Sequence, residues 1–424
     1  MSRIRLSALT SALLALLLLA QPAEAQLRPR ARGGLGPDRG QEVLDLLGPE
    51  HVVRDAWRMV ERHFFDKSLL REKGWDQSLE RALTKARGLS DPLEVHRVIN
   101  EMLGELKVSH LALLENDVWR RELAQEFRNQ PAVKAGCELA LIEGRYYVAG
   151  VALASPAALA GLQDGDEVLA IDGQAPAQSP LLVDGGHDPG LPGPHSFSLR
   201  VEAGQKLAFR VRASEGGPLA TKTLEPKPFS LIQSARESVR LEQVGESTIG
   251  VISLPHFIHP EIYRITRRAL QGPLREADSL VLDVRGRGGS SWVVRAILGL
   301  FSGRRAIWRK PVVVLTDGWT RSAKEIFAHT WKERGLGPIV GERTQGACIA
   351  CQFFELSDGS VLCLPIMDVR RLSGGVYLEG IGVQPDVRVR QLPLPYRQGQ
   401  DRILAAGLRR AASLVQPQQK AEAF

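Results

Sequence analysis

The sequence is poor in aromatic residues and has no concentrated run of one charge sign. Aromatic residues make up 6% of the 424 residues, and its 55 Lys and Arg residues, against 48 Asp and Glu residues, are dispersed along the chain. A nucleic-acid-binding surface combines a basic stripe with stacking aromatic side chains. We therefore expect no nucleic-acid partner. No period of 20–50 residues repeats, which excludes a solenoid.

Long hydrophobic runs are absent except at the N-terminus. Residues 1–25, MSRIRLSALTSALLALLLLAQPAEA, have two arginines, an apolar run and a final Ala-Glu-Ala, the pattern of a secretory signal peptide. An apolar core of roughly 13 residues is too short to span a bilayer. Position 26 is Gln rather than Cys, so no lipid attachment is indicated. We expect cleavage near Ala25, export to the periplasm, no integral membrane span, and a disordered linker over 26–40.

Only four cysteines are present: Cys137, Cys348, Cys351 and Cys363. An even count in an oxidising compartment permits disulfides, whose pairing the sequence leaves open. Cys348 and Cys351 form a C-x-x-C, which is a redox motif in some proteins. Here it lies in a strand pattern rather than at the helix N-terminus that lowers the pKa of a reactive thiol. We favour structural disulfides or small buried thiols for all four.

The pattern of apolar residues divides the chain into segments, and its size predicts two or three domains. Residues 41–128 show helical periodicity and predict an N-terminal helical domain. Short strands fill 132–228. From 229 to 395 strands and helices alternate, which predicts a layered α/β domain with a parallel sheet. Residues 396–424 form a C-terminal helix or tail. The expected fold class is α+β and multidomain.

Within the β-rich segment, ASPAALAGLQDGDEVLAIDGQ at 154–174 resembles a PDZ module of the bacterial protease-associated kind. Such a module binds an extended chain end by strand addition, and its backbone N–H groups receive the terminal carboxylate. The resemblance implies peptide binding at Gly136, Cys137, Glu138 and Leu139. The alternative is a module that packs against its neighbour and binds nothing. A Pro- and Gly-rich insertion at 175–197 departs from the compact PDZ pattern.

A candidate nucleophile lies in DGWTRSAKEIFAHTW, residues 317–331, which follows the apolar strand PVVVL at 311–315. Ser322 occupies the turn between that strand and a predicted helix. Free N–H groups at a helix N-terminus suit an oxyanion. A serine hydroxyl is nevertheless a weak nucleophile until a neighbouring base activates it. Taken alone, Ser322 is also consistent with an ordinary polar residue at a helix start.

Several motifs extend this pattern: LVLDVRGRGGS at 280–290, IVGERTQG at 339–346 and LEGIGVQPDV at 378–387. Together with the order of helical domain, PDZ-like module and β/α core, they resemble the carboxyl-terminal processing (tail-specific) protease family. The resemblance covers nearly all of the chain after residue 40. It implies a ClpP/crotonase-like core and makes Ser322 the nucleophile.

Best-known members of that family pair the serine with a lysine, and the corresponding position here is Ala347. The core nevertheless contains three lysines at different positions. Lys324 is about 200° around the helix from Ser322 and points away. Lys332 is about 15 Å further along the same helix, and Lys310 begins the strand whose other end leads to the serine. None of them is expected to reach the hydroxyl.

The tricorn-type and retinoid-binding-protein-like branch of the family has a Thr-x-Gly-(Gly/Ala) sequence at this place, as in residues 344–347. Tricorn-type enzymes use a histidine oriented through a serine and a glutamate. The resemblance implies His110 as the general base, with Ser109 and Glu379 as its orienting residues. We also expect an oxyanion hole, formed by the backbone N–H of Gly288 or Gly289 together with that of Ala323.

Two functions follow. The first is a periplasmic serine-type endopeptidase that cleaves unstructured C-terminal regions of proteins through a Ser322 acyl-enzyme. The second, favoured by the missing lysine, is a catalytically silent PDZ-containing protein that holds a peptide or ligand. Neither needs a cofactor. His256 and His259 lack carboxylate partners at metal-ligand spacing, so no metal site is expected.

Overall fold

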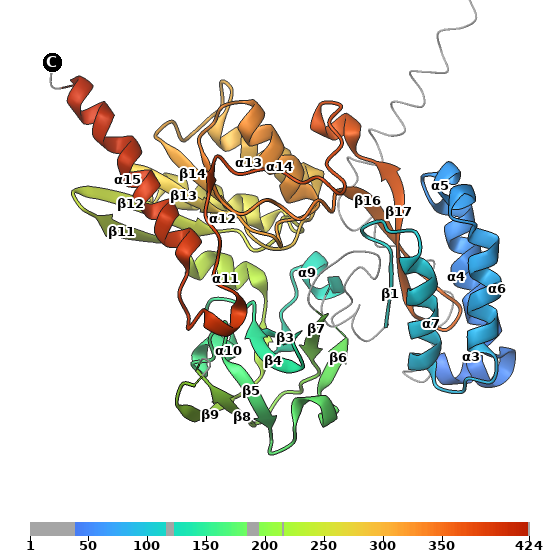
Figure 1. Ribbon diagram of the computed structural model, residues 1–424. Coiled ribbons are helices and arrows are strands. Elements are labelled where there is room, and N and C mark those ends of the chain that lie inside the picture. Colours follow the sequence, from blue (N-terminus) through green and yellow to red (C-terminus); the bar gives the residue numbers. More distant parts are fainter. Residues whose placement is uncertain (1–38, 116–122, 185–194, 214–215, 423–424) are drawn as a thin grey trace, which may run out of the picture.

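The computed structural model describes residues 39–115, 123–184, 195–213 and 216–422 (Figure 1). The expected signal peptide, 1–25, and nearly all of the expected linker, 26–40, lie outside the described residues. Helices and strands are mixed throughout, so the expected combination of α and β structure is confirmed. None of the helices in the described ranges is long and apolar enough to cross a membrane.

Five amphipathic helices at the N-terminus form a unit that we call the cap: α3 (Arg39–Leu47), α4 (Pro49–His63), α5 (Lys67–Glu72), α6 (Trp75–Ala86) and α7 (Pro92–Gly104). The start of α5 is stabilised because the side chain of Asp66 accepts hydrogen bonds from two free backbone N–H groups. Asp91 caps α7 in the same way, with proline at the first helical position. The buried faces of these helices share one hydrophobic core.

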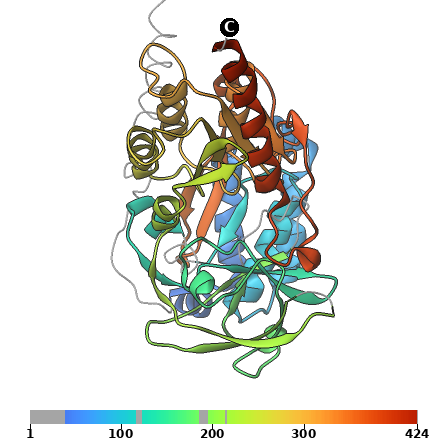
Figure 2. The ribbon, with the colours of Figure 1, turned by 90° about the vertical axis from the view of Figure 1, so that its left-hand side faces the viewer.

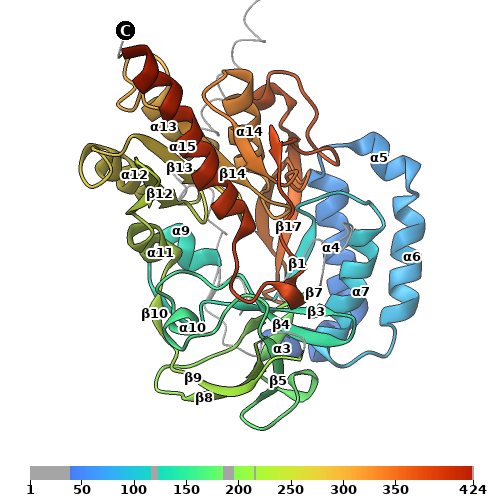
Figure 3. The same cartoon turned by 60° about the vertical axis from the view of Figure 1, so that its left-hand side comes forward.

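A three-stranded antiparallel sheet completes the cap, in the order β1 (Ala112–Leu114), β17 (Val361–Asp368), β16 (Ile349–Glu355). Leu362 and Leu364 of β17 belong to the hydrophobic core of the cap helices. Figures 1 and 3 show this sheet beside α4 and α7. Sequence analysis assigns these two late strands to the α/β segment 229–395. The structure instead packs them against the N-terminal helices, because β17 pairs with β1.

The β-rich segment forms a seven-stranded sheet in the order β6-β7-β3-β4-β5-β8-β9. Its strands are Leu182–Asp184 (β6), His195–Leu199 (β7), Glu138–Ile142 (β3), Arg145–Ala149 (β4), Glu167–Ile171 (β5), Leu207–Arg212 (β8) and Leu219–Leu224 (β9). The chain enters at β2 (Ala132–Lys134) and leaves at β10 (Lys227–Phe229), which pair antiparallel. This pairing brings the two ends of the segment together. We call it the seven-stranded unit.

Short helices connect these units: α9 (Ala124–Arg128), α10 (Pro156–Leu159) and α11 (Leu231–Glu237), with 3-10 turns at Pro176–Gln178, Arg370–Ser373 and Leu394–Tyr396. The start of α10 matches its sequence. Ser155 is the N-cap and accepts a hydrogen bond from the N–H of Ala158, and Pro156 is the first helical residue.

The core is a six-stranded sheet in the order β11-β12-β13-β14-β15-β18. Its strands are Arg240–Val244 (β11), Ser247–Ser253 (β12), Ser279–Asp283 (β13), Val312–Thr316 (β14), Ile339–Gly341 (β15) and Val387–Arg388 (β18). All neighbours from β12 to β18 are parallel, and β11 is antiparallel to β12. The strands β13 and β14 are buried along their whole length, as expected for a parallel sheet covered on both faces.

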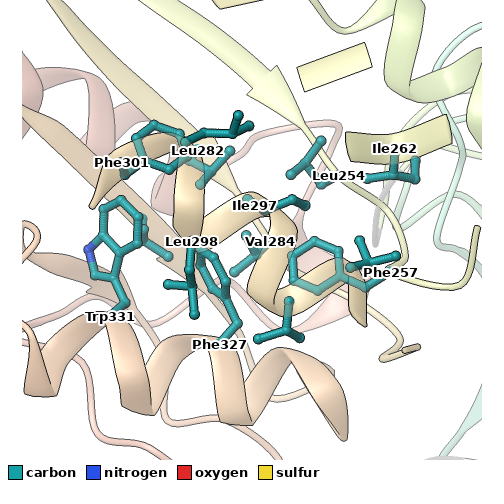
Figure 4. Close-up of a cluster of buried hydrophobic side chains, with 14 of the residues drawn as sticks. Leu254, Phe257, Ile262, Leu282, Val284, Ile297, Leu298, Phe301, Phe327 and Trp331 are labelled. Carbon is teal, nitrogen blue, oxygen red and sulfur yellow. The ribbon is translucent and has the colours of Figure 1, made fainter. Parts of the chain in front are cut away.

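Helices cover both faces of this sheet. One face carries α12 (Glu261–Gln271), α13 (Ser291–Phe301) and α14 (Ala323–Glu333), whose buried side chains form the largest hydrophobic cluster. Figure 4 shows the part of the cluster around Phe257, Phe327 and Trp331, whose rings contact one another in series. On the other face the long helix α15 (Arg402–Glu422) crosses the strands, as Figure 2 also shows. The catalytic candidates lie where β13 and β14 end.

All four cysteines are free thiols. Of the two expected forms, the structure therefore has thiols and no disulfide. Burial raises the pKa of Cys137 to about 12 and raises the pKa of Cys348 still further. A C-x-x-C whose first thiol resists ionisation is unsuited to thiol–disulfide exchange.

Candidate active site

The nucleophile turn joins β14 to α14. Asp317 ends the strand region, and its carboxylate accepts hydrogen bonds from the N–H of Trp319 at 3.0 Å and from the hydroxyl of Thr320 at 2.8 Å. Ser322 then adopts φ 59° and ψ −128°. This region is strained for any residue with a side chain, and such strain is concentrated at functional sites. The sharp turn resembles the strained strand-to-helix turn that presents the nucleophile in α/β-hydrolases.

A buried carboxylate, Glu325, holds this turn in place. It accepts hydrogen bonds from the N–H of Ser322 at 3.1 Å, from Gly346 N–H at 2.7 Å and from Ala347 N–H at 2.8 Å. A fourth comes from the hydroxyl of Thr344 at 2.6 Å. Desolvation raises the pKa of Glu325, and these hydrogen bonds oppose the rise. The Thr-Gln-Gly-Ala sequence therefore serves as the partner of the nucleophile helix.

The candidate base and its orienting residues are brought together as the resemblance implies. The Oγ of Ser109 lies 2.8 Å from Nδ1 of His110 and donates to Oε2 of Glu379 at 3.0 Å. Glu379 also accepts the N–H of Ser109 at 2.8 Å and that of Cys348 at 2.6 Å. The glutamate therefore joins the end of the cap to the core. Like Ser322, His110 has a positive φ, 59°, which is uncommon for a residue other than glycine.

The hydrogen bonds of this series determine which ring nitrogen of His110 carries the proton. The hydroxyl of Ser109 has one proton, which it donates to the carboxylate of Glu379. Its oxygen is then the acceptor for Nδ1–H of His110, and Nε2 keeps the lone pair that a general base needs. The guanidinium of Arg321 lies at the longer distance of 3.5 Å from the same Nδ1. Arg321 immediately precedes Ser322, so a side chain of the nucleophile turn reaches the ring of His110.

The glycine turn after β13 packs directly against the nucleophile. A Cβ on Gly288 would lie 2.4 Å from Cβ of Ser322, so only glycine fits there. Gly289 has φ 150°, and a Cβ on it would lie 2.1 Å from the carbonyl carbon of Phe257. Among the hydrogen bonds of the described residues, none uses the N–H of Gly288, Gly289 or Ala323 as a donor. These three groups are therefore free to bind an oxyanion.

No lysine of the core approaches the nucleophile. Ala347 is fully buried, and its carbonyl accepts the N–H of Ser322 at 2.8 Å. The side chain of Lys310 bonds to two carbonyls beside β13, and that of Lys332 bonds to Asp386. Lys324 points away from Ser322, as expected, and donates to the carbonyls of two other loops.

The residues that the resemblance assigns to peptide binding lie at the start of β3. Strand addition there needs a free edge, but β3 already pairs with β4 on one side and β7 on the other. The strand β7 comes from the Pro- and Gly-rich insertion. Its residues Phe197 and Ser196 lie opposite Leu139 and Ala140. A peptide can therefore add to β3 only if β7 leaves.

One member of that set, Glu138, contacts the candidate site. Its carboxylate forms an ion pair with Arg287 at 2.6 Å, and Arg287 directly precedes Gly288. The other members, Cys137 and Leu139, are buried, and Gly136 packs on Ser155. The seven-stranded unit thus lies against the glycine turn.

A cavity of about 370 Å³ is lined in part by Asp317, Trp319, Glu342, Arg343 and Gln391. It contains neither Ser322 nor His110, so the chemistry is not located there.

Three side chains of the site have roles that the sequence did not predict: Arg321 and Glu325, and Lys324, which was considered only as a base and excluded. All three lie next to Ser322 in the sequence. The available signal was a run of charged residues at the start of a helix whose other face is apolar. Such a run ordinarily indicates a solvated face, yet Lys324 and Glu325 are both fully buried.

Part of the chain matches a known protein family. Residues 301–389 match the model of peptidase family S41. The chain belongs to this family. The matched segment of this S41 peptidase carries Ser322, Glu325 and Glu379, whereas His110 lies outside it. The expected membership in the carboxyl-terminal processing serine protease family is confirmed.

Two curated relatives illustrate the two branches. A putative tricorn protease homologue of Streptomyces coelicolor is 26% identical over 411 residues, which cover 89% of this chain and 34% of that protein. A carboxyl-terminal-processing protease of Picosynechococcus sp. is 24% identical over 406 residues, covering 84% of this chain and 87% of that protein. The S41 peptidase described here therefore spans about a third of the tricorn-type relative.

Solved structures share the fold at low identity. The photosystem II D1 C-terminal processing protease aligns with a TM-score of 0.52 and 22% identity, covering 84% of this chain and 98% of that one. Mature CPAF complexed with lactacystin aligns with a TM-score of 0.53 and 14% identity, covering 87% and 99%. At these identities the likeness extends to the fold of the S41 peptidase and no further.

Proposed function

We propose that this S41 peptidase is a periplasmic serine-type endopeptidase with Ser322 as nucleophile and His110 as general base. The observation that carries the proposal is the hydrogen-bonded series from Glu379 through Ser109 to Nδ1 of His110. It leaves Nε2 as the acceptor, and Ser322 lies on a strained turn of the core. This is the orienting arrangement that serine hydrolases require of a third residue.

In the first half-reaction, Nε2 of His110 takes the proton of Ser322 as Oγ bonds to the scissile carbonyl carbon. The oxyanion receives the free N–H groups of the glycine turn and of Ala323. The imidazolium then gives its proton to the departing amine, and the C–N bond breaks. In the second half-reaction, His110 deprotonates a water that attacks the ester, and the proton returns to Oγ of Ser322.

The cap supplies the base and the core supplies the nucleophile, so their approach depends on how the two units close. Among the hydrogen bonds of the described residues, none joins Oγ of Ser322 to the ring of His110. Catalytic hydrogen bonds commonly tighten only in the substrate complex. We propose that substrate binding brings the cap and core together and completes this contact.

The proposed substrates are protein or peptide chains with disordered C-terminal regions. The N–H groups of the glycine turn and of Ala323 suit the carbonyl of an extended backbone, and the seven-stranded unit, which we interpret as PDZ-like, contacts the glycine turn through Glu138 and Arg287. Export rests on the N-terminal signal pattern. Turnover without a metal or an organic cofactor is consistent with a Ser-His mechanism.

The test is labelling with a serine-directed aryl phosphonate, followed by mass spectrometry of the adduct. We expect an adduct on Ser322 and cleavage of a disordered protein. The variant Ser322→Ala is expected to lose both, whereas His110→Ala loses at least about 10³-fold in labelling rate. Ser413→Ala, an exposed serine on α15, is the matched control.

The buried Ala347 at the lysine position favours a second candidate, a catalytically silent S41 protein that holds a peptide. That candidate predicts no adduct on Ser322 and no cleavage. It also predicts a cellular phenotype that Ser322→Ala leaves intact. The same phosphonate experiment therefore decides between the two.

A further inference from the structure

A buried lysine lies immediately behind the candidate site. Lys324 is the second residue of α14, and its side chain is fully buried. Its Nζ donates to the carbonyl of Leu254 at 2.7 Å and to that of Arg285 at 2.8 Å. It also lies 5.4 Å from the centre of the Phe257 ring. The two hydrogen bonds use two of the three N–H donors of an ammonium, and the Phe257 ring is within range of a cation–π contact with its charge.

These contacts link the nucleophile helix to both loops that build the glycine turn. Leu254 follows β12, and Arg285 follows β13 and leads directly into the turn. The two loops are also joined to each other, because the N–H of Phe257 donates to the carbonyl of Gly288 and that of Ser290 donates to the carbonyl of Phe257. Leu254 and Phe257 appear in Figure 4, within the hydrophobic cluster.

Burial of this ammonium is costly, and the surrounding charges offset the cost only in part. Desolvation lowers the pKa of Lys324 to about 7, while the charges of Asp283 and Asp317 act to raise it. Arg285 acts in the same direction as desolvation. A hydrophobic side chain would avoid the cost but would leave two buried carbonyls without a donor. The lysine therefore stabilises the two loops by hydrogen bonds to their carbonyls, rather than the hydrophobic cluster.

We propose that Lys324 is a positioning residue that fixes the oxyanion-binding N–H groups of the glycine turn relative to Ser322. The proposal rests on the proposed function. The ammonium touches neither the nucleophile nor the substrate position. It holds Arg285 and Leu254 at fixed distances from the helix that begins next to Ser322. The position of Gly288, which packs against Ser322, follows from those distances.

This role predicts a specific kinetic signature. Misplacing a catalytic group by about 1 Å costs on the order of 10²-fold in rate. Oxyanion binding is stronger in the transition state than in the ground state, so its loss lowers kcat and leaves KM unchanged. We therefore expect Lys324→Met to lower kcat about 10²-fold at unchanged KM. Lys324→Gln, whose amide keeps two N–H donors, is expected to recover at least tenfold of that loss.

The experiment measures kcat and KM on a fluorogenic peptide, together with the affinity of a peptide boronic acid whose tetrahedral adduct occupies the oxyanion hole. We expect the boronate affinity of Lys324→Met to fall by the same factor as kcat. Lys332→Met is the matched control, because it removes an exposed lysine from the same helix, and it should match the wild type. Thermal unfolding of each variant verifies that the variant is folded at the temperature of the kinetic assay.

The outcomes separate the two proposals. If the wild type fails to react with the phosphonate, the proposed function is wrong and this inference falls with it. If the wild type reacts and Lys324→Met keeps kcat, or changes only KM, the positioning role alone is wrong. Should Lys324→Met not fold, Lys324→Gln decides: a boronate affinity reduced in proportion to kcat supports the role, and a loss of kcat at full boronate affinity overturns it.

Discussion

The nucleophile turn and the base are held by two carboxylates that differ in what they connect. Glu325 receives four hydrogen bonds, all from residues 322–347 of the core. Glu379 receives three, two of them from Ser109 at the end of the cap. The nucleophile is therefore fixed by the folding of one unit, whereas the base is fixed by the docking of two. A change in docking alters the position of His110 but not that of Ser322.

Removing the carboxylate of Glu325 should have the largest effect on stability and on the reactivity of Ser322. Glu325→Ala leaves three buried donors without an acceptor, because the N–H of Ser322 keeps the carbonyl of Ala347, and each such group costs about 1–3 kcal/mol. We expect the free energy of unfolding to fall by about 4 kcal/mol or more, with no phosphonate labelling of Ser322. Chemical denaturation measures the first effect. Glu333→Ala, an exposed residue of the same helix, should change neither quantity. A stable, labelled Glu325→Ala protein would contradict this account of the turn.

Changing the carboxylate on the base side should affect catalysis more than stability. In Glu379→Gln an amide N–H is available to Ser109, whose proton then turns to Nδ1 of His110. Nε2 consequently carries the proton and is no longer a base. We expect kcat to fall about 10³-fold, comparable with the loss on mis-setting a histidine tautomer in a serine protease. The free energy of unfolding should fall by only about 1–2 kcal/mol. If Glu325→Ala and Glu379→Gln lowered the free energy of unfolding by the same amount, the two carboxylates would not differ in role as described.

The pH dependence of activity follows from the same carboxylate. Desolvation raises the pKa of Glu379 above its ordinary value of 4.5. The folded protein therefore binds a proton at pH values where the unfolded chain has lost it, so this group's contribution to stability falls as pH rises through that window. The ionised form is needed to orient Ser109. As pH is lowered, protonation of Glu379 should reduce kcat at a pH above 4.5. The pH dependence of kcat in Glu379→Gln should lack this decline.

Much of the core was predictable because its signals are local. Apolar runs followed by periodic helices predict β13, β14 and α14, and the helical angle from Ser322 predicts that Lys324 points away. The position of the late hairpin was not predictable. Its turn at 356–360 is evident in the sequence, but its place in the cap depends on β1, whose three residues lie over 200 positions earlier. Pairing over such a separation leaves no local pattern.

The candidate site shows the same division. Ser322, Ser109, His110 and Glu379 were predicted by resemblance to a known family, from motifs that can be read in the sequence. Lys324 was excluded as a base, but its contacts with two loops follow from tertiary packing that helical periodicity does not describe. The insertion at 175–197 has the composition of a loop, and proline and glycine disfavour strands. It nevertheless forms β6 and β7, because the exposed edge of β3 offers backbone partners.

The smallest expected effect concerns that edge, and it tests whether the seven-stranded unit behaves as fixed structure or as a docking module. The strand β7 competes with any added peptide at the effective concentration of a tethered segment, which is in the millimolar range. Ser196→Pro removes a ladder donor from a strand of only five residues. Measured in the Ser322→Ala background by fluorescence anisotropy, the affinity for a peptide with a free C-terminus should rise about tenfold.

A pair of cysteines gives the opposite variant and an internal control. Ala140 and Ser196 lie directly opposite each other, within the range of a cross-strand disulfide. In the double variant Ala140→Cys, Ser196→Cys, oxidation should lock β7 onto β3 and abolish peptide binding, and reduction should restore the wild-type affinity. Equal binding by the oxidised and reduced forms would place the peptide elsewhere. Capture of substrate would then depend on the boundary between cap and core, which also sets the position of His110.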